Sequence, residues 1–150
     1  MRLMLSLGLV LLPMVAFAQV KRTNPPTLSK PTGYTHIVEV DMSRTKMVYI
    51  SGQVALDKDG KVVGEADMKA QAEQVFKNLE AALTAAGAKF SDIVKMNTYV
   101  TDMDKAPAVR EVRTRYFGDT TPASTLVQVV KLARPELMLE IEVVAAVPVH

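Results

Sequence analysis

The sequence predicts an α+β fold in which a single mixed β-sheet carries two helices packed on one face. Segments rich in β-branched and aromatic residues stand in both halves of the 150-residue chain. Two stretches with apolar residues at three- and four-residue spacing flank one of these segments. The predicted order of elements is therefore β-β-β-α-β-α-β-β. Right-handed crossovers place both helices on the same face, so we expect neighbouring subunits to cover the other face.

The first eighteen residues are expected to be a signal peptide. Arg2 is their one charge, residues 3–15 are almost continuously apolar, and Ala16-Phe17-Ala18 matches a small-x-small cleavage pattern. A membrane anchor is the alternative, but the apolar run is shorter than the roughly 18 residues that a spanning helix needs. We therefore expect cleavage before Gln19, an exported protein in the periplasm or outside the cell, and no membrane attachment after cleavage.

Residues 19–32 are polar and contain three prolines, so they are expected to form an extended or disordered leader. The folded domain would then cover residues 33–150. It opens with strand composition at residues 34–40 and 46–56. Asp57-Lys58-Asp59-Gly60 supplies a turn that would bring residues 61–63 back alongside.

The two helices are predicted from periodicity and from the residues at their ends. Residues 67–86 have helical spacing, and Gly87 follows at the position where a helix C-terminus favours glycine. A second helix is expected to start at Asp104 as N-cap and to end at Gly118. Pro107 is tolerable in its first turn, and its buried stripe would be Val109, Val112 and Tyr116.

The remaining strands are expected at residues 93–100, 124–132 and 137–146. Their side chains should alternate between the two faces of the sheet. One face of the first of them would carry Val94, Met96, Thr98 and Val100. In the last strand one face would carry Leu137, Leu139, Ile141 and Val143, and the other Met138, Glu140, Glu142 and Val144.

Charge and cysteine content exclude several classes of protein. Removal of Arg2 with the signal peptide would lower the net charge from +2 to +1, which predicts no nucleic-acid partner. The absence of cysteine excludes disulfides and cysteine metal sites. His36 and His150 cannot make a spaced metal site by themselves, and Met68 stands where a calcium loop starting at Asp57 needs a glutamate. We expect no metal and no cofactor.

Four short motifs stand in a recognisable order: Ser51-Gly52-Gln53, Val94-Lys95, Pro122-Ala123 and residues 139–145, LEIEVVA. Together they resemble the reactive-intermediate deaminase family, called Rid or YjgF, from about Tyr34 to the C-terminus. The resemblance implies a chorismate-mutase-like fold and a homotrimer that binds small molecules in clefts between subunits. It also implies hydrolysis of enamines and imines, such as 2-aminoacrylate, to 2-ketoacids.

The same resemblance implies the residues of the site. Glu140 would be the catalytic carboxylate that positions the attacking water as a general base, while Tyr34, Ser51 and Gly52 would line the cleft. Plainer alternatives are that Glu140 is a solvated or interface acid and that Ser51-Gly52 is a β-bulge. Mutual repulsion between Glu140 and Glu142 would raise the pKa of one of them.

Ser124 stands where deaminating members carry an arginine that grips the substrate carboxylate, and Thr125 is the neighbouring candidate for that task. By ungapped spacing, Arg110 falls where some deaminases place a cleft asparagine, so it would be a replacement cation. The alternative is that Arg110 belongs with Arg113 to a solvated helix face.

Three functions stay open at this point. The first is hydrolytic deamination through Glu140, and the second is a noncatalytic or differently specific ligand-binding trimer, which Ser124 favours. The third, an endoribonuclease or translation inhibitor, is disfavoured because the chain offers no basic surface and no histidine pair.

Overall fold

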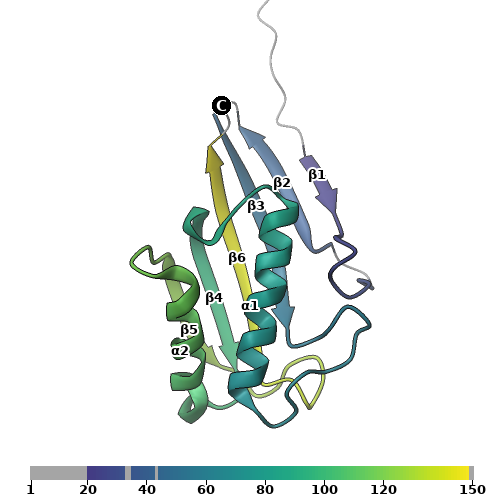
Figure 1. The fold of residues 1–150 in the computed structure, drawn as a ribbon, viewed down its shortest axis with the longest axis vertical. Helices are drawn as coiled ribbons and strands as arrows, with labels where there is room; N and C mark the ends of the chain where they lie inside the picture. Colours follow the sequence, from purple (N-terminus) through teal and green to yellow (C-terminus); the bar gives the residue numbers. More distant parts are fainter. Residues whose placement is uncertain (1–19, 33–34, 43, 149–150) are drawn as a thin grey trace, which may run out of the picture.

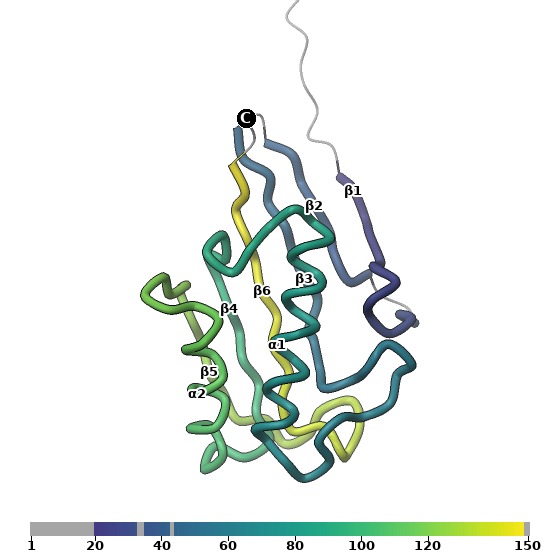
Figure 2. The backbone as a smooth tube through the Cα atoms, in the orientation of Figure 1, coloured from purple at the N-terminus to yellow at the C-terminus, as the bar shows by residue number. Residues whose placement is uncertain are grey.

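The computed structural model describes residues 20–32, 35–42 and 44–148, which form one six-stranded mixed sheet with two helices on one face (Figures 1 and 2). The strand order is β1-β2-β3-β6-β4-β5; β4 and β5 are parallel, and the other neighbours are antiparallel. The predicted fold class is confirmed. The elements are β1 (Val20–Thr23), β2 (Ile37–Met42), β3 (Thr45–Val54), α1 (Met68–Ala85), η1 (Phe90–Asp92), β4 (Ile93–Val100), η2 (Met103–Lys105), α2 (Ala106–Phe117), β5 (Ala123–Gln128) and β6 (Leu139–Pro148).

The segment predicted as a leader contributes a strand, so that prediction is corrected. β1 pairs antiparallel with β2, from Val20 beside Val40 to Thr23 beside Ile37. Leu28, which follows it, is 5% exposed and belongs to the core. An edge strand needs hydrogen bonds on one side only, and the three prolines of the segment lie beyond β1, where they interrupt no ladder. The predicted signal peptide and Tyr34 lie outside the described residues.

The three strands before α1 therefore differ from those expected. Residues 61–63 make no strand, and one bridge joins Leu56 to Val62. The turn between them is confirmed: the Asp57 carboxylate accepts hydrogen bonds from the backbone N–H groups of Asp59 and Lys61, both at 2.9 Å. Gly60 has a φ of 77° there, a conformation that suits glycine.

Helix α1 begins and ends as predicted, because its caps are local. The Asp67 side chain accepts hydrogen bonds from the backbone N–H groups of Lys69 and Ala70, and Gly87 beyond the C-terminus has a φ of 67°. Helix α2 starts differently. Asp104 is not its N-cap but lies in η2, whose own cap is Asp102.

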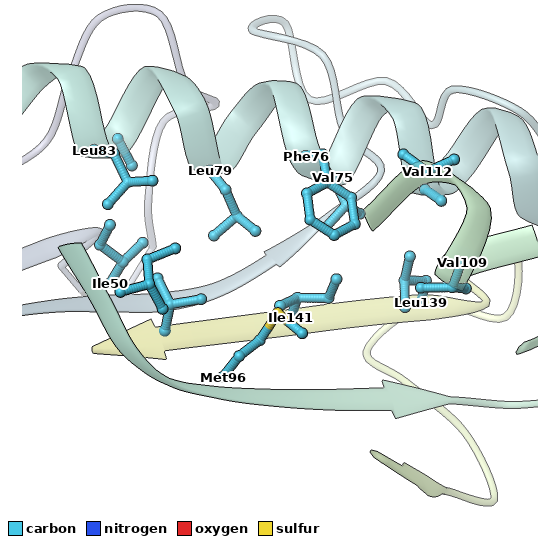
Figure 3. Packing of buried hydrophobic residues seen from close by; sticks show 14 of the residues in the cluster. Ile50, Val75, Phe76, Leu79, Leu83, Met96, Val109, Val112, Leu139 and Ile141 are labelled. Atoms are coloured by element: carbon cyan, nitrogen blue, oxygen red, sulfur yellow. The ribbon is translucent and has the colours of Figure 1, made fainter. Parts of the chain in front are cut away.

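The core lies between the helices and the sheet, where side chains of α1 and α2 meet those of β6 and β4 (Figure 3). The alternation of β6 is confirmed, with its apolar set buried and Glu140 and Glu142 on the other face. In β4 the prediction for Val94 is wrong. The ladder shifts between Ile93 and Lys95, so Ile93 is buried and Val94 exposed.

The second face of the sheet carries no helix among the described residues (Figure 1). It mixes polar side chains with large apolar ones: Tyr49 is 47% exposed and Val127 39%. No helix in the described part of the chain is long and apolar enough to cross a membrane. We call this surface, lined by alternate residues of β3, β6, β4 and β5, the open face.

Candidate functional site

Glu140 lies against Gly52, and the contact depends on the absence of a side chain at position 52. The register between β3 and β6 shifts between Ile50 and Gln53, so the β-bulge alternative for this segment holds. A Cβ atom placed on Gly52 would lie 1.9 Å from Glu140 Oε1 and 2.7 Å from its Cδ. Glycine therefore leaves the space that the carboxylate occupies.

Glu140 and Glu142 have different surroundings on the open face. Burial raises the pKa of the Glu140 carboxyl, and the nearby Glu142 charge raises it further. The expected raised pKa thus belongs to Glu140, with burial as its larger cause. Glu142 accepts hydrogen bonds from Asn97 Nδ2 at 2.7 Å and from the Tyr99 hydroxyl at 3.0 Å. The bond to Glu142 raises the pKa of Tyr99.

Ser51 makes two hydrogen bonds that tie β3 to the residues just before β2. Its backbone N–H donates to the His36 carbonyl oxygen at 2.9 Å, and its hydroxyl donates to the Thr35 carbonyl oxygen at 2.5 Å. Ser51 also lines an open hollow of ≈ 310 Å³ together with Lys95, Asn97 and Glu142. The hollow places Ser51 beside Glu142, while Gly52 lies against Glu140. Tyr34, the other predicted residue of this group, is not among the described residues.

Ser124 and Thr125 point to opposite faces of β5. In the parallel ladder with β4, Ser124 lies beside Met96, which is buried under the helices, and Thr125 lies beside Asn97 on the open face. The Thr125 hydroxyl accepts a hydrogen bond from Lys95 Nζ at 2.7 Å. Ser124 is therefore turned away from the side of the sheet on which Glu140 stands.

Arg110 of α2 and Ser124 line the same small hollow, ≈ 40 Å³, between α2 and β5. Thr98, Leu126 and Arg113 also line it. Arg110 is exposed and makes no ion pair within the described residues. The structure thus places Arg110, the replacement cation expected from the sequence, in the same hollow as Ser124.

The predicted site residues consequently form two groups. Glu140, Ser51, Gly52 and Thr125 belong to the open face, whereas Ser124 and Arg110 belong to the helix side of the sheet. One chain does not bring the two groups together. Among the described residues no cluster of three or more histidine, aspartate or glutamate side chains is arranged to hold a metal ion.

Three side chains near the site were not proposed as site residues from the sequence: Asn97 and Tyr99 on β4, and Arg113 on α2, which lines the hollow of Arg110 and Ser124. Lys95 was noted there only as part of a motif. Asn97 and Tyr99 stand at alternate positions of a predicted strand, which was the available signal. Their partner Glu142 follows from the register of β4 with β6, in which Asn97 lies beside Glu142 and Tyr99 beside Glu140.

Comparison with known proteins agrees with this architecture. A family model described as Endoribonuclease L-PSP matches residues 27–147. A solved structure from Yersinia pestis, the protein YyfA of the conserved Rid protein family, is 29% identical, has a TM-score of 0.77 and covers 86% of this chain and 100% of its own. The chain belongs to this family, Rid or YjgF. The resemblance seen in its motifs is thereby confirmed.

Two relatives of this Rid chain are similar over most of their length. Protein DfrA of Myxococcus xanthus is 39% identical over 112 residues, which is 75% of this chain and 83% of DfrA. The mouse 2-iminobutanoate/2-iminopropanoate deaminase is 34% identical over 126 residues, 84% of this chain and 88% of the relative. The name of the mouse relative supports imine-deaminase-type function at the level of the family.

Proposed function

We propose that this Rid protein hydrolyses small enamines or imines of the 2-aminoacrylate type to 2-ketoacids, with Glu140 as catalytic residue and Arg110 as the anchor of the substrate carboxylate. The observation that carries the proposal is the shared hollow of Arg110 and Ser124, because it offers a cation where the family's arginine is missing. The names of the deaminase relatives support the reaction class.

The surroundings of Glu140 suit a general base. In the proposed reaction the oxygen of a water molecule bonds to the carbon of the C=N group, while the Glu140 carboxylate accepts the water proton. The nitrogen of the tetrahedral adduct receives that proton and then the proton of the new hydroxyl group. The C–N bond breaks as the ketone C=O bond forms, and the nitrogen leaves as ammonia. A pKa raised by burial and by Glu142 makes Glu140 a stronger base than an exposed glutamate.

Arg110 would bind the carboxylate that the substrate carries next to the reacting carbon. A guanidinium group offers two parallel N–H donors to a carboxylate, whereas the Ser124 hydroxyl offers one neutral donor. Loss of such a charge-assisted bond costs about 2 kcal/mol, which corresponds to about thirtyfold in affinity. Arg110→Ala should therefore raise KM by about that factor.

The complete site would form between subunits. Because Glu140 and Arg110 lie on opposite sides of one sheet, a reacting molecule that touches both needs them from different chains. We propose a homotrimer in which the open face of one subunit meets the hollow beside α2 of the next. The apolar residues of the open face support a buried interface.

Ser124 favours a second candidate, a ligand-binding trimer without deaminase activity or with another specificity. The structure of the hollow is compatible with it, since the site retains a cation beside a small polar residue. A third possibility follows from the words of the family description. Two histidines and a net charge of +2 provide neither an acid–base pair nor a basic surface for RNA, so we do not propose a ribonuclease.

The deciding experiment follows ketoacid release from imino acids that an amino-acid oxidase generates in the presence of semicarbazide as trap. Acceleration above spontaneous hydrolysis that disappears in Glu140→Ala and falls in Arg110→Ala supports deamination. Lys77→Ala, which removes one exposed cation from α1, is the matched control. Activity only in Ser124→Arg would instead support a scaffold for another ligand, and no activity in any variant would refute the proposed reaction.

We also propose that the protein is exported after removal of residues 1–18. The apolar segment behind Arg2 and the Ala16-Phe17-Ala18 pattern support this. Mass spectrometry of the protein recovered from cell fractions tests it directly: an N-terminus at Gln19 in the exported fraction is expected, and an intact Met1 inside the cell contradicts it.

A further inference from the structure

Arg113 lies beside Arg110 at a second, larger hollow. Both arginines line the ≈ 40 Å³ hollow that holds Ser124 and also a neighbouring hollow of ≈ 280 Å³. Thr114, Phe117, Gly118 and Thr121 line the rest of the larger one. Residues three apart on a helix project from the same side, so the guanidinium groups of Arg110 and Arg113 both border the two neighbouring hollows.

Neither arginine has a carboxylate partner among the described residues. The other arginine of this helix, Arg115, pairs with Glu73 of α1, and Glu111 pairs with Lys69. Arg113 is held differently, with its guanidinium carbon 5.6 Å from the centre of the Phe117 ring. Glu73 and Glu111 are thus paired with other cations, and the positive charge of Arg110 and Arg113 remains for a ligand.

We propose that this site selects small 2-imino or 2-keto acids that carry a second carboxylate, with Arg110 holding the first carboxylate and Arg113 the second. The inference rests on the proposed function only in taking Arg110 as the first anchor. Ser124 is small, so it leaves both guanidinium groups accessible from one hollow. The second hollow has room for a side chain that a two- or three-carbon ligand would not fill.

Calorimetry with stable ketoacids tests the selectivity without any turnover. We expect 2-oxoglutarate to bind at least tenfold more tightly than 2-oxobutanoate. Arg113→Ala should bring the ratio close to one while the affinity for 2-oxobutanoate stays unchanged. Arg113→Lys should keep part of the preference, and Lys77→Ala should keep all of it.

Three results would overturn the inference. They are equal binding of the two ketoacids by the unchanged protein, equal weakening of both by Arg113→Ala, and binding of inorganic phosphate as tight as that of 2-oxoglutarate. Melting temperatures of the variants show whether they fold. Failure of the proposed function is distinguishable, because absent imine hydrolysis with the binding ratio intact refutes the reaction alone.

Discussion

The Glu140 carboxylate occupies the space that a side chain on Gly52 would need. A Cβ atom placed on Gly52 would lie 1.9 Å from Glu140 Oε1. The glycine comes from the irregular part of β3 and the glutamate from the neighbouring β6. The place of the candidate base is therefore determined by a residue that has no side chain to contribute.

Gly52→Ala should remove activity and lower stability, because the added methyl group must displace the Glu140 carboxylate. Overpacking of this kind costs about 1–3 kcal/mol. Urea unfolding of a double-mutant cycle measures it: Gly52→Ala should cost clearly less in a Glu140→Ala background, where the colliding atoms are absent. An equal cost in both backgrounds would contradict the collision.

The rate of hydrolysis should rise with pH through the raised pKa of Glu140, since the carboxylate is the base. The profile of kcat/KM should therefore have its lower inflection above the ordinary glutamate value of 4.5. Glu142→Gln removes the second cause of the shift, so the inflection should move to lower pH. A profile unchanged by Glu142→Gln would show that this charge does not act on the base.

Complementary subunits should restore a site that each variant alone lacks. Glu140→Ala and Arg110→Ala chains, coexpressed in equal amounts, should regain about one quarter of the wild-type activity if each site of a closed ring draws the two residues from different chains. Light scattering checks the expected trimer mass. If coexpression gives no more activity than the single variants, then one chain must supply both residues.

The ion pair that attaches β1 should make stability depend on pH in the acid range. Burial raises the pKa of Glu39, but hydrogen bonds and attraction from Lys46 and Lys21 outweigh it, and the net pKa is lowered. Lys46 Nζ lies 2.8 Å from Glu39 Oε1, and Lys21 Nζ of β1 lies 3.2 Å from Oε2.

A lowered pKa in the folded state means that this stabilisation is complete above about pH 4.5 and is lost as the pH falls through the folded-state value. Glu39→Gln should therefore lower the free energy of unfolding at pH 7 by about 2 kcal/mol and reduce its decline below pH 4.5. Thermal unfolding between pH 3 and 7 measures both effects. An unchanged acid slope in Glu39→Gln would assign the slope to other carboxylates.

Much of the fold could be predicted because its signals are local. The turn at Asp57 and the glycine that follows α1, Gly87, depend on a few neighbouring residues, and the structure confirms both. The start of α2 was missed because Asp102 and Asp104 are equally good capping residues, and the intervening η2 decides between them. β1 was missed because its hydrogen bonds go to β2, which the polar sequence of residues 20–23 does not reveal.

For the candidate site, too, some features could be predicted from the sequence and others depend on the tertiary structure. The sequence by itself determined the family, the absence of an arginine at position 124, and the alternation that places Glu140 and Glu142 on the same face of the sheet. Each of these depends on residue identity or on a two-residue period. Only the tertiary structure decided that Arg110 lies beside Ser124 and that Glu140 stands on the opposite side of the sheet. Strand register and helix packing set these relationships, and both are made by contacts between residues far apart in the chain.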